Sequence, residues 1–429
     1  MALLLKGARC VDPAHELDHV TDIAIKNGKI KDIGQDLSID KGEVRDMSGK
    51  VLVPGLMDMH VHLREPGQEY KEDIASGLRA AAKGGFCAVL AMPNTNPTCD
   101  TGSIVGFILN RARQSCATRI YVAGAISRGL TGLELAEIGD MYAAGAVAYT
   151  DDGRGVQDIG LARLAMDYIK QFKSPVLSHC QMEDLTAKGV VNEGVVSTRL
   201  GLAGWPAAAE EIQIARDIAL GELTGCALHI QHITTARGVE LVREAKAKGL
   251  PVSCEVTPHH LFLNEDDVDT SYDTNMKMNP PLRTKADNRA LQQALVDGTI
   301  DVVATDHAPH AAHEKALEFE LAPFGCTGLE TALGAVLTYM VHEGTLSYGQ
   351  LVERMAHAPR ALLGIKPVGL KVGLSADVTI IDPELGWVVG SDGWESKSTN
   401  NAFNGRSFQG RATDVYVDGF ASMQDGVVS

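Results

Sequence analysis

The stretch Lys50-Val-Leu-Val-Pro-Gly-Leu-Met-Asp-Met-His-Val-His62 is an apolar, β-branched run that ends in two histidines. Runs of the same kind recur along the middle of the chain and alternate with segments of helical periodicity. The further runs are Phe86–Met92, Arg119–Ile126, Gly145–Thr150, Ser174–His179, Cys226–His232, Pro251–Val256 and Ile300–Thr305. Helices are predicted, for example, at Glu72–Lys83, Asp158–Lys173, Glu210–Leu220 and Asp287–Val296. Eight strand-then-helix units predict an α/β fold, a (β/α)8 TIM barrel. A large doubly wound sheet is the alternative, but no G-x-G-x-x-G turn follows any of these strands.

Both ends of the chain carry strand patterns of a different kind. Asp22–Ile33 alternates apolar and polar residues around Asn27-Gly28, and Asp414–Asp425 does so around Asp418-Gly419. Ala376–Asp382 adds a further short strand. Because an isolated hairpin is only marginally stable, we expect the two ends to pair in one small composite β-sandwich domain. The expected domains are 1–54 with 366–429 for this composite part, and 55–365 for the catalytic barrel.

The composition excludes some classes of function. The 429 residues include 39 Lys+Arg against 55 Asp+Glu, a formal charge of −16, which argues against a nucleic-acid-binding surface. The sequence contains no run of 18 apolar residues, so no membrane span is predicted. The eight cysteines, including Cys116, form no C-x-x-C pair, and we expect them to be reduced and mostly buried. A cytoplasmic, enzyme-sized protein is the expectation.

Histidines and aspartates gather where the predicted strands end. They are His60, His62, Asp151, Asp152, His179, His232, Asp306, His307 and His310. In a (β/α)8 barrel the carboxyl ends of the strands meet at one rim, where the active site lies. Taken singly, His179 or His232 is as well explained as a core histidine. Their recurrence at several strand ends favours a shared site.

His60 and His62 lie two residues apart, so in a strand both point to the same face. With His179, His232 and a carboxylate there are enough nitrogen and oxygen ligands for two divalent ions, and zinc is the expected metal. Two such ions need an anionic bridge. The segment between Asp140 and Ile169 contains no lysine that could be carbamylated, which leaves Asp151 or Asp152.

The motifs resemble those of a known family. Asp58-Met-His-Val-His-Leu-Arg-Glu-Pro-Gly67 and Ala304-Thr-Asp-His-Ala-Pro-His310 are similar to the two signatures of the dihydroorotases of the amidohydrolase superfamily. Further agreement, in the expected order, comes from Met92–Thr95, Thr150–Gly153, Ser178–Cys180, Gln231–Thr234 and Met278–Arg283. The likeness covers almost the whole chain. It is closest to the bacterial monofunctional type, in which an aspartate replaces the bridging carbamylated lysine.

The resemblance implies a role for each matching position. His60, His62 and Asp306 would bind the more buried of two zinc ions, and His179 and His232 the more exposed one. Asp152 would bridge the ions, and Asp151 would instead hydrogen-bond its loop. Asp306 would also be the catalytic general acid and base.

The resemblance also implies a set of substrate-binding residues. These are His62; Arg64, Asn94 and His310 at the substrate carboxylate; and Asn279 with the backbone of Phe324 and Gly325 at the ring amide. Arginine suits a carboxylate because it can bind both oxygens at once. Without the resemblance, Arg64 is as well explained by pairing with Glu65 or Glu69, and Asn279 as a turn residue.

The implied reaction is the reversible cyclisation of N-carbamoyl-L-aspartate to L-dihydroorotate in pyrimidine biosynthesis. Ala311–Gly325 follows the last barrel strand and is long enough to form a lid. An allantoinase or hydantoinase is the nearest alternative, and Arg64 favours a substrate with a carboxylate. A non-catalytic partner of aspartate transcarbamoylase is another, although every expected ligand position is occupied. We expect a homodimer, from the prevalence of twofold symmetry, and a complex with the transcarbamoylase is an open possibility.

Overall fold

The computed structural model describes residues 2–115, 118–186, 188–268 and 270–429. Eight parallel strands form a nearly closed barrel in the hydrogen-bonded order β15-β14-β13-β10-β9-β8-β7-β6. They are β6 (Leu56–Val61), β7 (Phe86–Ala91), β8 (Arg119–Gly124), β9 (Ala146–Tyr149), β10 (Val176–Ser178), β13 (Leu228–Ile230), β14 (Val252–Val256) and β15 (Val302–Val303). The amide of His62 donates to the carbonyl of His307 (2.8 Å), which brings the first strand to the segment after the last. The predicted (β/α)8 fold is confirmed, and each strand lies within its predicted run.

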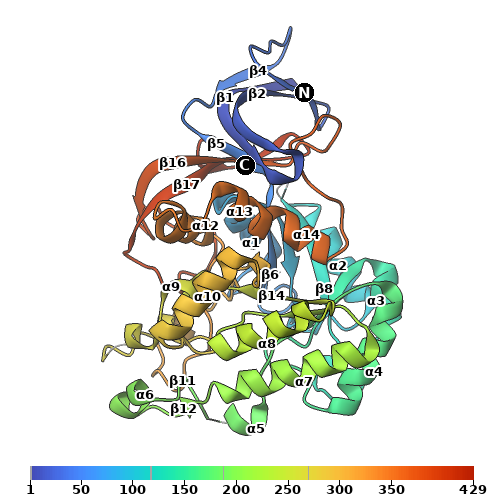
Figure 1. The fold of residues 1–429 in the computed structure, drawn as a ribbon, viewed down its shortest axis with the longest axis vertical. Helices are drawn as coiled ribbons and strands as arrows, with labels where there is room; N and C mark the ends of the chain where they lie inside the picture. Colours follow the sequence, from blue (N-terminus) through green and yellow to red (C-terminus); the bar gives the residue numbers. More distant parts are fainter. Residues whose placement is uncertain (1, 116–117, 187, 269) are drawn as a thin grey trace.

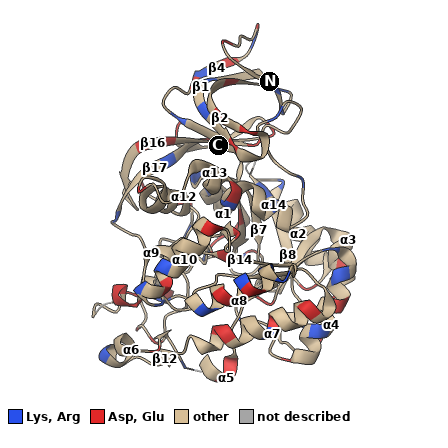
Figure 2. Ribbon diagram, in the orientation of Figure 1, with Lys and Arg blue, Asp and Glu red and all other residues tan. Residues whose placement is uncertain are grey.

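Helices surround the barrel because their apolar faces cover strands that are buried on both sides. The longer ones are α1 (Ile74–Lys83), α2 (Gly102–Ala112), α3 (Ile138–Ala144), α4 (Ile159–Ile169), α7 (Ala208–Thr224), α8 (Ala236–Ala247) and α10 (Lys285–Asp297). Sequence signals set their ends: the Asp158 side chain accepts from the Leu161 amide at the start of α4, and Gly225 ends α7 in the left-handed conformation. Both signs of charge occur along α8 and α10 (Figure 2).

The shorter helical elements lie in connections and near the C-terminus. They are α5 (Glu183–Thr186), α6 (Val195–Leu200), α9 (Pro258–Phe262), α11 (Ala312–Lys315), α12 (Ala332–Val336), α13 (Tyr348–Val352), α14 (Ala358–Leu362), the 3-10 turns η1 (Pro13–His15), η2 (Arg128–Leu130), η3 (Lys170–Phe172), η4 (Glu265–Asp267) and η5 (Thr274–Met276), and the π-helical turns η6 (Leu337–Val341) and η7 (Glu353–His357). Among the described residues, no helix combines the length and apolar character that crossing a bilayer requires.

The two ends of the chain build one nine-stranded sheet at one end of the barrel (Figure 1). Its strands are β1 (Ala2–Asp12), β2 (Leu17–Lys26), β3 (Lys29–Gly34), β4 (Glu43–Asp46), β5 (Val51–Pro54), β16 (Val378–Val388), β17 (Ser407–Val417), β18 (Phe420–Gln424) and β19 (Val427–Val428). The ends join where β5 runs antiparallel to β16, with Pro54 opposite Val378. A separate small pair is β11 (Val191–Asn192) with β12 (Gly204–Trp205).

The two predicted hairpin turns meet within this terminal sheet. Asn27 and Gly28 both have positive φ (53° and 77°), as do Asp418 and Gly419 (49° and 71°). A Cβ atom on Gly28 would lie 2.9 Å from the carbonyl oxygen of Asp418, so a larger residue does not fit between the turns.

The described cysteines are all buried and free, as expected. Cys116 lies outside the described residues. Burial is the main cause that raises the pKa of the Cys87 thiol to about 12, so this cysteine behaves as a small apolar side chain.

Candidate active site

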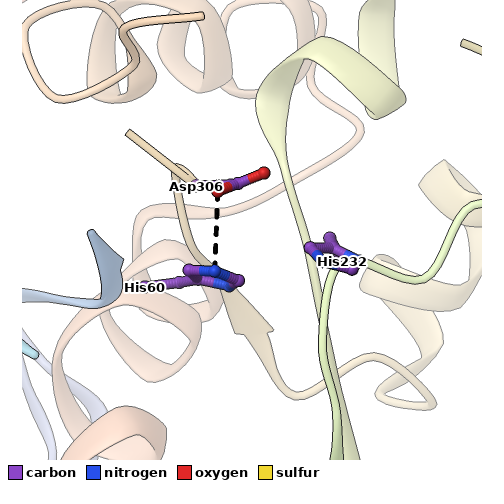
Figure 3. A group of neighbouring side chains, drawn as sticks. All are labelled: His60, His232 and Asp306. Atoms are coloured by element: carbon purple, nitrogen blue, oxygen red, sulfur yellow. Dashed lines mark ion pairs between the residues drawn. The ribbon is translucent and has the colours of Figure 1, made fainter. Parts of the chain in front are cut away.

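Six side chains from five strand ends converge at one rim of the barrel. His60 lies in β6 and His62 follows it, while the others follow later strands: Asp152 after β9, His179 after β10, His232 after β13 and Asp306 after β15. Parallel strands bring together residues that are far apart in sequence, because all their carboxyl ends meet on the same side. Figure 3 shows His60, His232 and Asp306 facing one another from separate segments.

Asp152 lies at the centre of this group. Its carboxylate oxygens are 3.4 Å from His60 Nε2, 3.3 Å from His62 Nε2, 3.4 Å from His179 Nδ1 and 3.7 Å from His232 Nε2. Asp151 points elsewhere. It accepts hydrogen bonds from the amides of Ile126 (2.8 Å) and Ser127 (2.9 Å) and from the Ser127 hydroxyl.

Asp306 is the second carboxylate of the group. Its Oδ1 lies 2.9 Å from His62 Nε2 and 3.5 Å from His60 Nε2. Burial opposes the ionised form of Asp306 and of Asp152, but the surrounding imidazoles outweigh it and hold both carboxyl pKa values well below their usual range. Burial likewise opposes charge on His60, yet Asp152, Glu255 and Asp306 raise its pKa well above the ordinary value.

The donor set suits divalent transition-metal ions. Three overlapping groups have ligand atoms within 4.8 Å of one another: His60, His232 and Asp306; His60, His62 and Asp152; and Asp152, His179 and His232. Imidazole nitrogens and carboxylate oxygens at such separations are typical ligands of zinc and similar ions. The buried His and Asp side chains therefore could hold metal.

Three of the four histidines are held by a hydrogen bond on their outward nitrogen. His60 Nδ1 donates to Glu255 Oε1 (2.5 Å), His62 Nδ1 to Asn94 Oδ1 (2.7 Å) and His179 Nε2 to Gln181 Oε1 (2.9 Å). Because these oxygens only accept, each outward nitrogen carries a hydrogen, and the inward nitrogen is the one that would bind a metal ion. His232 differs: its Nδ1 is buried without a hydrogen-bond partner among the described residues.

Sequence reasoning missed two of these supporting residues, Glu255 and Gln181. Glu255 is fully buried in β14 and also bonds His229 Nε2 (3.2 Å). Burial disfavours its charge, but His60 and His229 lower the Glu255 pKa to about 2. A carboxylate inside the apolar run Val252–Val256 was a usable signal. Gln181, two residues beyond His179, has no such signal in the sequence.

A cavity of about 160 Å³ opens above the histidine and aspartate cluster. Its lining includes every residue expected to contact substrate: His62, Arg64, Asn94, Asn279, His310, Phe324 and Gly325. His60 lies deeper and does not line it. The structure thus brings the expected metal-binding and substrate-binding residues to one place.

Arg64 is a buried cation without a carboxylate partner in the described part of the chain. Its Nε donates to the Pro309 carbonyl (3.2 Å). The alternative pairings do not occur, because Glu65 pairs with Arg111 (2.9 Å) and Glu69 accepts from the Gly67 amide (2.7 Å). Burial lowers the Arg64 pKa, although nearby carboxylates oppose that shift. A buried, unpaired guanidinium is a binding site for an anion.

His310 and Asn279 offer further polar atoms at the cavity. His310 Nε2 donates to the Phe324 carbonyl (2.8 Å), and burial together with Arg64 lowers the His310 pKa to about 2, so its ring is neutral. Asn279 Nδ2 donates to Gln181 Oε1 (3.3 Å). His310 Nδ1, 3.8 Å from Glu314 Oε2, and Asn279 Oδ1 are buried without a hydrogen-bond partner among the described residues, so both are available to a ligand.

Comparison with known proteins agrees with this geometry. A family model described as "Dihydro-orotase-like" matches residues 49–238. Curated proteins named dihydroorotase are similar over the full length: 49% identity for that of Pelotomaculum thermopropionicum, covering 100% of both chains, and 46% for that of Acetivibrio thermocellus, covering 99% of this chain and 100% of the relative.

Solved structures give the same architecture. The L-hydantoinase (dihydropyrimidinase) of Arthrobacter aurescens superposes with a TM-score of 0.89 at 27% identity, covering 100% of this chain and 97% of that one. A D-hydantoinase at 24% identity, with a TM-score of 0.86 over 100% of this chain and 96% of its own, shares the fold. On the full-length identity to the curated relatives, the chain belongs to the dihydroorotase family.

Proposed function

We propose that this protein is a dihydroorotase that interconverts N-carbamoyl-L-aspartate and L-dihydroorotate, a step of pyrimidine biosynthesis. The observation that carries the proposal is the buried Arg64, without a carboxylate partner among the described residues, in the wall of a cavity whose floor holds the His and Asp cluster. Both compounds bear carboxylates, which a guanidinium binds through two parallel hydrogen bonds. Asn94 can assist, because His62 occupies its Oδ1 while its amide nitrogen makes no hydrogen bond among the described residues.

The proposed cofactor is a pair of zinc ions. His60, His62 and Asp306 would hold one ion and His179 and His232 the other, with Asp152 bridging in place of the carbamylated lysine common in the superfamily. The central position of Asp152, within 3.7 Å of all four imidazoles, supports this assignment. When bound, such ions lower the pKa of water and polarise an amide carbonyl.

The protein side chains supply the proton transfer. In the hydrolytic direction a C–O bond forms at the ring carbonyl while the ring C–N bond breaks, so one proton must travel from the attacking water to nitrogen. Asp306 lines the cavity and its low pKa keeps it ionised, so it accepts that proton and returns it to the leaving nitrogen. Cyclisation reverses these steps.

The remaining ligand contacts follow from the unpaired polar atoms. Asn279 and the backbone of Phe324 and Gly325 would bind the ring amide, and Arg64 would hold the carboxylate. The neutral His310 donates its Nε2 hydrogen to Phe324, so it offers Nδ1 as an acceptor. A carboxylate contact from this nitrogen would require His310 to take up a proton on binding.

A turnover assay tests the proposal directly. The metal-loaded protein is offered dihydroorotate, carbamoyl aspartate, allantoin and a hydantoin at equal concentration. We expect preference for the two carboxylates; preference for allantoin or a hydantoin would establish the alternative cyclic amidase, and no turnover of any would favour a non-catalytic partner. Exhaustive chelation should abolish turnover, and zinc should restore it.

The cellular setting is part of the same proposal. We propose a cytoplasmic homodimer, with aspartate transcarbamoylase as a partner enzyme, since that enzyme produces carbamoyl aspartate. Sedimentation of the protein alone and mixed with the transcarbamoylase tests both points: a monomer in the first run, or separate boundaries in the second, would contradict them.

A further inference from the structure

Phe324 and Gly325, which line the cavity, lie at the end of segment 319–325, which follows α11. It has no regular secondary structure. Main-chain carbonyls in such a partly buried segment need donors from elsewhere, because no helix or sheet supplies them. Most of their donors are the side chains of two lysines and one histidine.

Lys277 supplies three of them. Its side chain is buried, and Nζ donates to the carbonyls of Phe319 (2.7 Å), Glu320 (2.9 Å) and Ala322 (2.7 Å). An ammonium group has three hydrogens, so every one is used on this segment. The carbonyl of Lys277 in turn accepts from the Gly325 amide (2.8 Å), and Nζ lies 4.5 Å from the centre of the Phe324 ring.

Lys315 supplies two more. Its Nζ donates to the carbonyls of Pro323 (3.0 Å) and Gly325 (3.1 Å). His310 Nε2 donates to the carbonyl between them, that of Phe324 (2.8 Å). Two lysines and one histidine therefore bind six of the seven carbonyls of the segment.

Neither lysine has a carboxylate within ion-pair distance in the described part of the chain. Burying an unpaired ammonium is costly, so a purely structural role is a poor explanation for two of them side by side. Burial lowers the pKa of each to about 8, which leaves both protonated at neutral pH. Both charges lie behind the wall of a cavity that already contains Arg64.

We propose that Lys277 and Lys315 are positioning residues: they fix segment 319–325 so that the backbone of Phe324 and Gly325 is prearranged for the ring amide, and their charges favour an anionic substrate. This inference rests on the proposed function for the identity of the substrate. The arrangement of the segment itself does not depend on it. Preorganised contacts contribute to affinity because their ordering cost is not incurred on binding.

The test compares Lys277→Met and Lys315→Met with a control at an exposed lysine, Lys170→Met. Lys170 Nζ also donates to a main-chain carbonyl, that of Thr224 (2.7 Å), but lies away from the cavity lining. Hydrogen exchange is measured on the metal-loaded proteins, where the amides of Leu321, Ala322 and Gly325 report on the segment because each is hydrogen-bonded. We expect exchange of these amides to be about tenfold faster in the first two variants and unchanged in the control.

Steady-state kinetics with carbamoyl aspartate supply the second readout. We expect KM to rise about tenfold with kcat within about twofold of wild type, the pattern of lost uniform binding. Lys315→Arg, which keeps the charge and donors, should restore protection and KM. Unchanged exchange in both Met variants would overturn the proposal, and so would faster exchange with an unchanged KM.

Two further results are informative. Should Lys277→Met not fold, Lys315→Met carries the same comparison, because its side chain holds the same segment from the other side. A wild-type protein that does not turn over carbamoyl aspartate contradicts the proposed function, while the exchange comparison still decides whether the lysines order the segment.

Discussion

The two pairs of histidines in the candidate site are built differently. His60 and His62 come from one strand, and the outward nitrogen of each donates to a side chain, Glu255 or Asn94. His179 and His232 come from two strands, and only His179 is held in this way, by Gln181. His232 Nδ1 has no partner in the described part of the chain. The first pair is therefore the more preorganised, and we expect the metal position that it forms to bind more tightly.

The largest effect should come from removing a ligand of the preorganised pair. His60→Ala deletes an imidazole and leaves Asp152, Glu255 and Asp306 without the group that faces all three carboxylates. We expect kcat/KM to fall by at least about 10³-fold, since the Lewis-acid contribution is worth several kcal/mol. Metal content and turnover are measured on the same preparation, and normal turnover would refute the assigned site.

A smaller loss is expected when the side chain that holds His60 in place, Glu255, is replaced. Glu255→Gln keeps the shape but removes the charge that accepts from His60, so we expect metal affinity at this position to fall about 10- to 100-fold. Competition with a chromophoric chelator gives the affinity. Glu330→Gln is the matched control, because Glu330 is another buried carboxylate, bound to the amides of Glu395 and Ser396 away from the cavity. Equal losses in both variants would remove the special role of Glu255.

We expect a smaller loss of metal affinity when the residue that supports the second pair, His179 and His232, is replaced. Gln181→Leu removes the acceptor of His179 Nε2 and a partner of Asn279, both neutral hydrogen bonds. We expect roughly a three- to tenfold loss in affinity of the second metal position, corresponding to about 1 kcal/mol. The same chelator titration resolves it. A loss larger than that of Glu255→Gln would reverse the proposed order of the two pairs.

The smallest effect on metal affinity is expected from replacing Asp12, a carboxylate that histidines bind outside the cavity. Asp12 contacts His15 Nδ1 (2.8 Å), His357 Nε2 (2.9 Å) and the Leu370 amide (2.6 Å) where the terminal sheet meets the barrel. Burial opposes its charge, but His357, Leu370 and His15 lower the Asp12 pKa to about 2. Asp12→Asn should leave metal affinity unchanged and cost about 2 kcal/mol of unfolding free energy at pH 6.

The pH dependence of that cost follows from the sign of the shift. Because the folded pKa of Asp12 is lower than the unfolded one, its contribution is present above about pH 4 and is lost as the pH falls toward 2. The difference in Tm between wild type and Asp12→Asn should therefore shrink over this range. A difference that stays constant would show that the ionisation of Asp12 does not contribute.

Much of this architecture could be predicted from the sequence because its signals are local. Buried β-branched runs such as Val252–Val256 mark the strands, and parallel strands bring their carboxyl ends together whatever the helices between them. His60 and His62 two residues apart needed no tertiary information. Glu255 is different, since its partner His60 is 195 positions away.

The role of Lys277 and Lys315 could likewise not be predicted from the sequence. Lys277 precedes Met278-Asn279 in the sequence and carries no sign that it is buried. Its role depends on carbonyls more than 40 residues later, in a segment without a periodic pattern. The choice of Asp152 over Asp151 is also tertiary, because it depends on which carboxylate turns toward Ser127 and which toward the imidazoles.

The terminal sheet has a consequence for how the chain is synthesised. The β5 strand leaves the ribosome before the barrel, but its partner β16 follows about 320 residues later. At roughly 5 to 20 residues per second, the edge of β5 remains unpaired for about 15 to 60 s during translation. Such an edge can pair with other nascent chains. The ladder between Pro54 and Val378 is thus among the last to form, and slower elongation would prolong the period in which this protein is prone to aggregate.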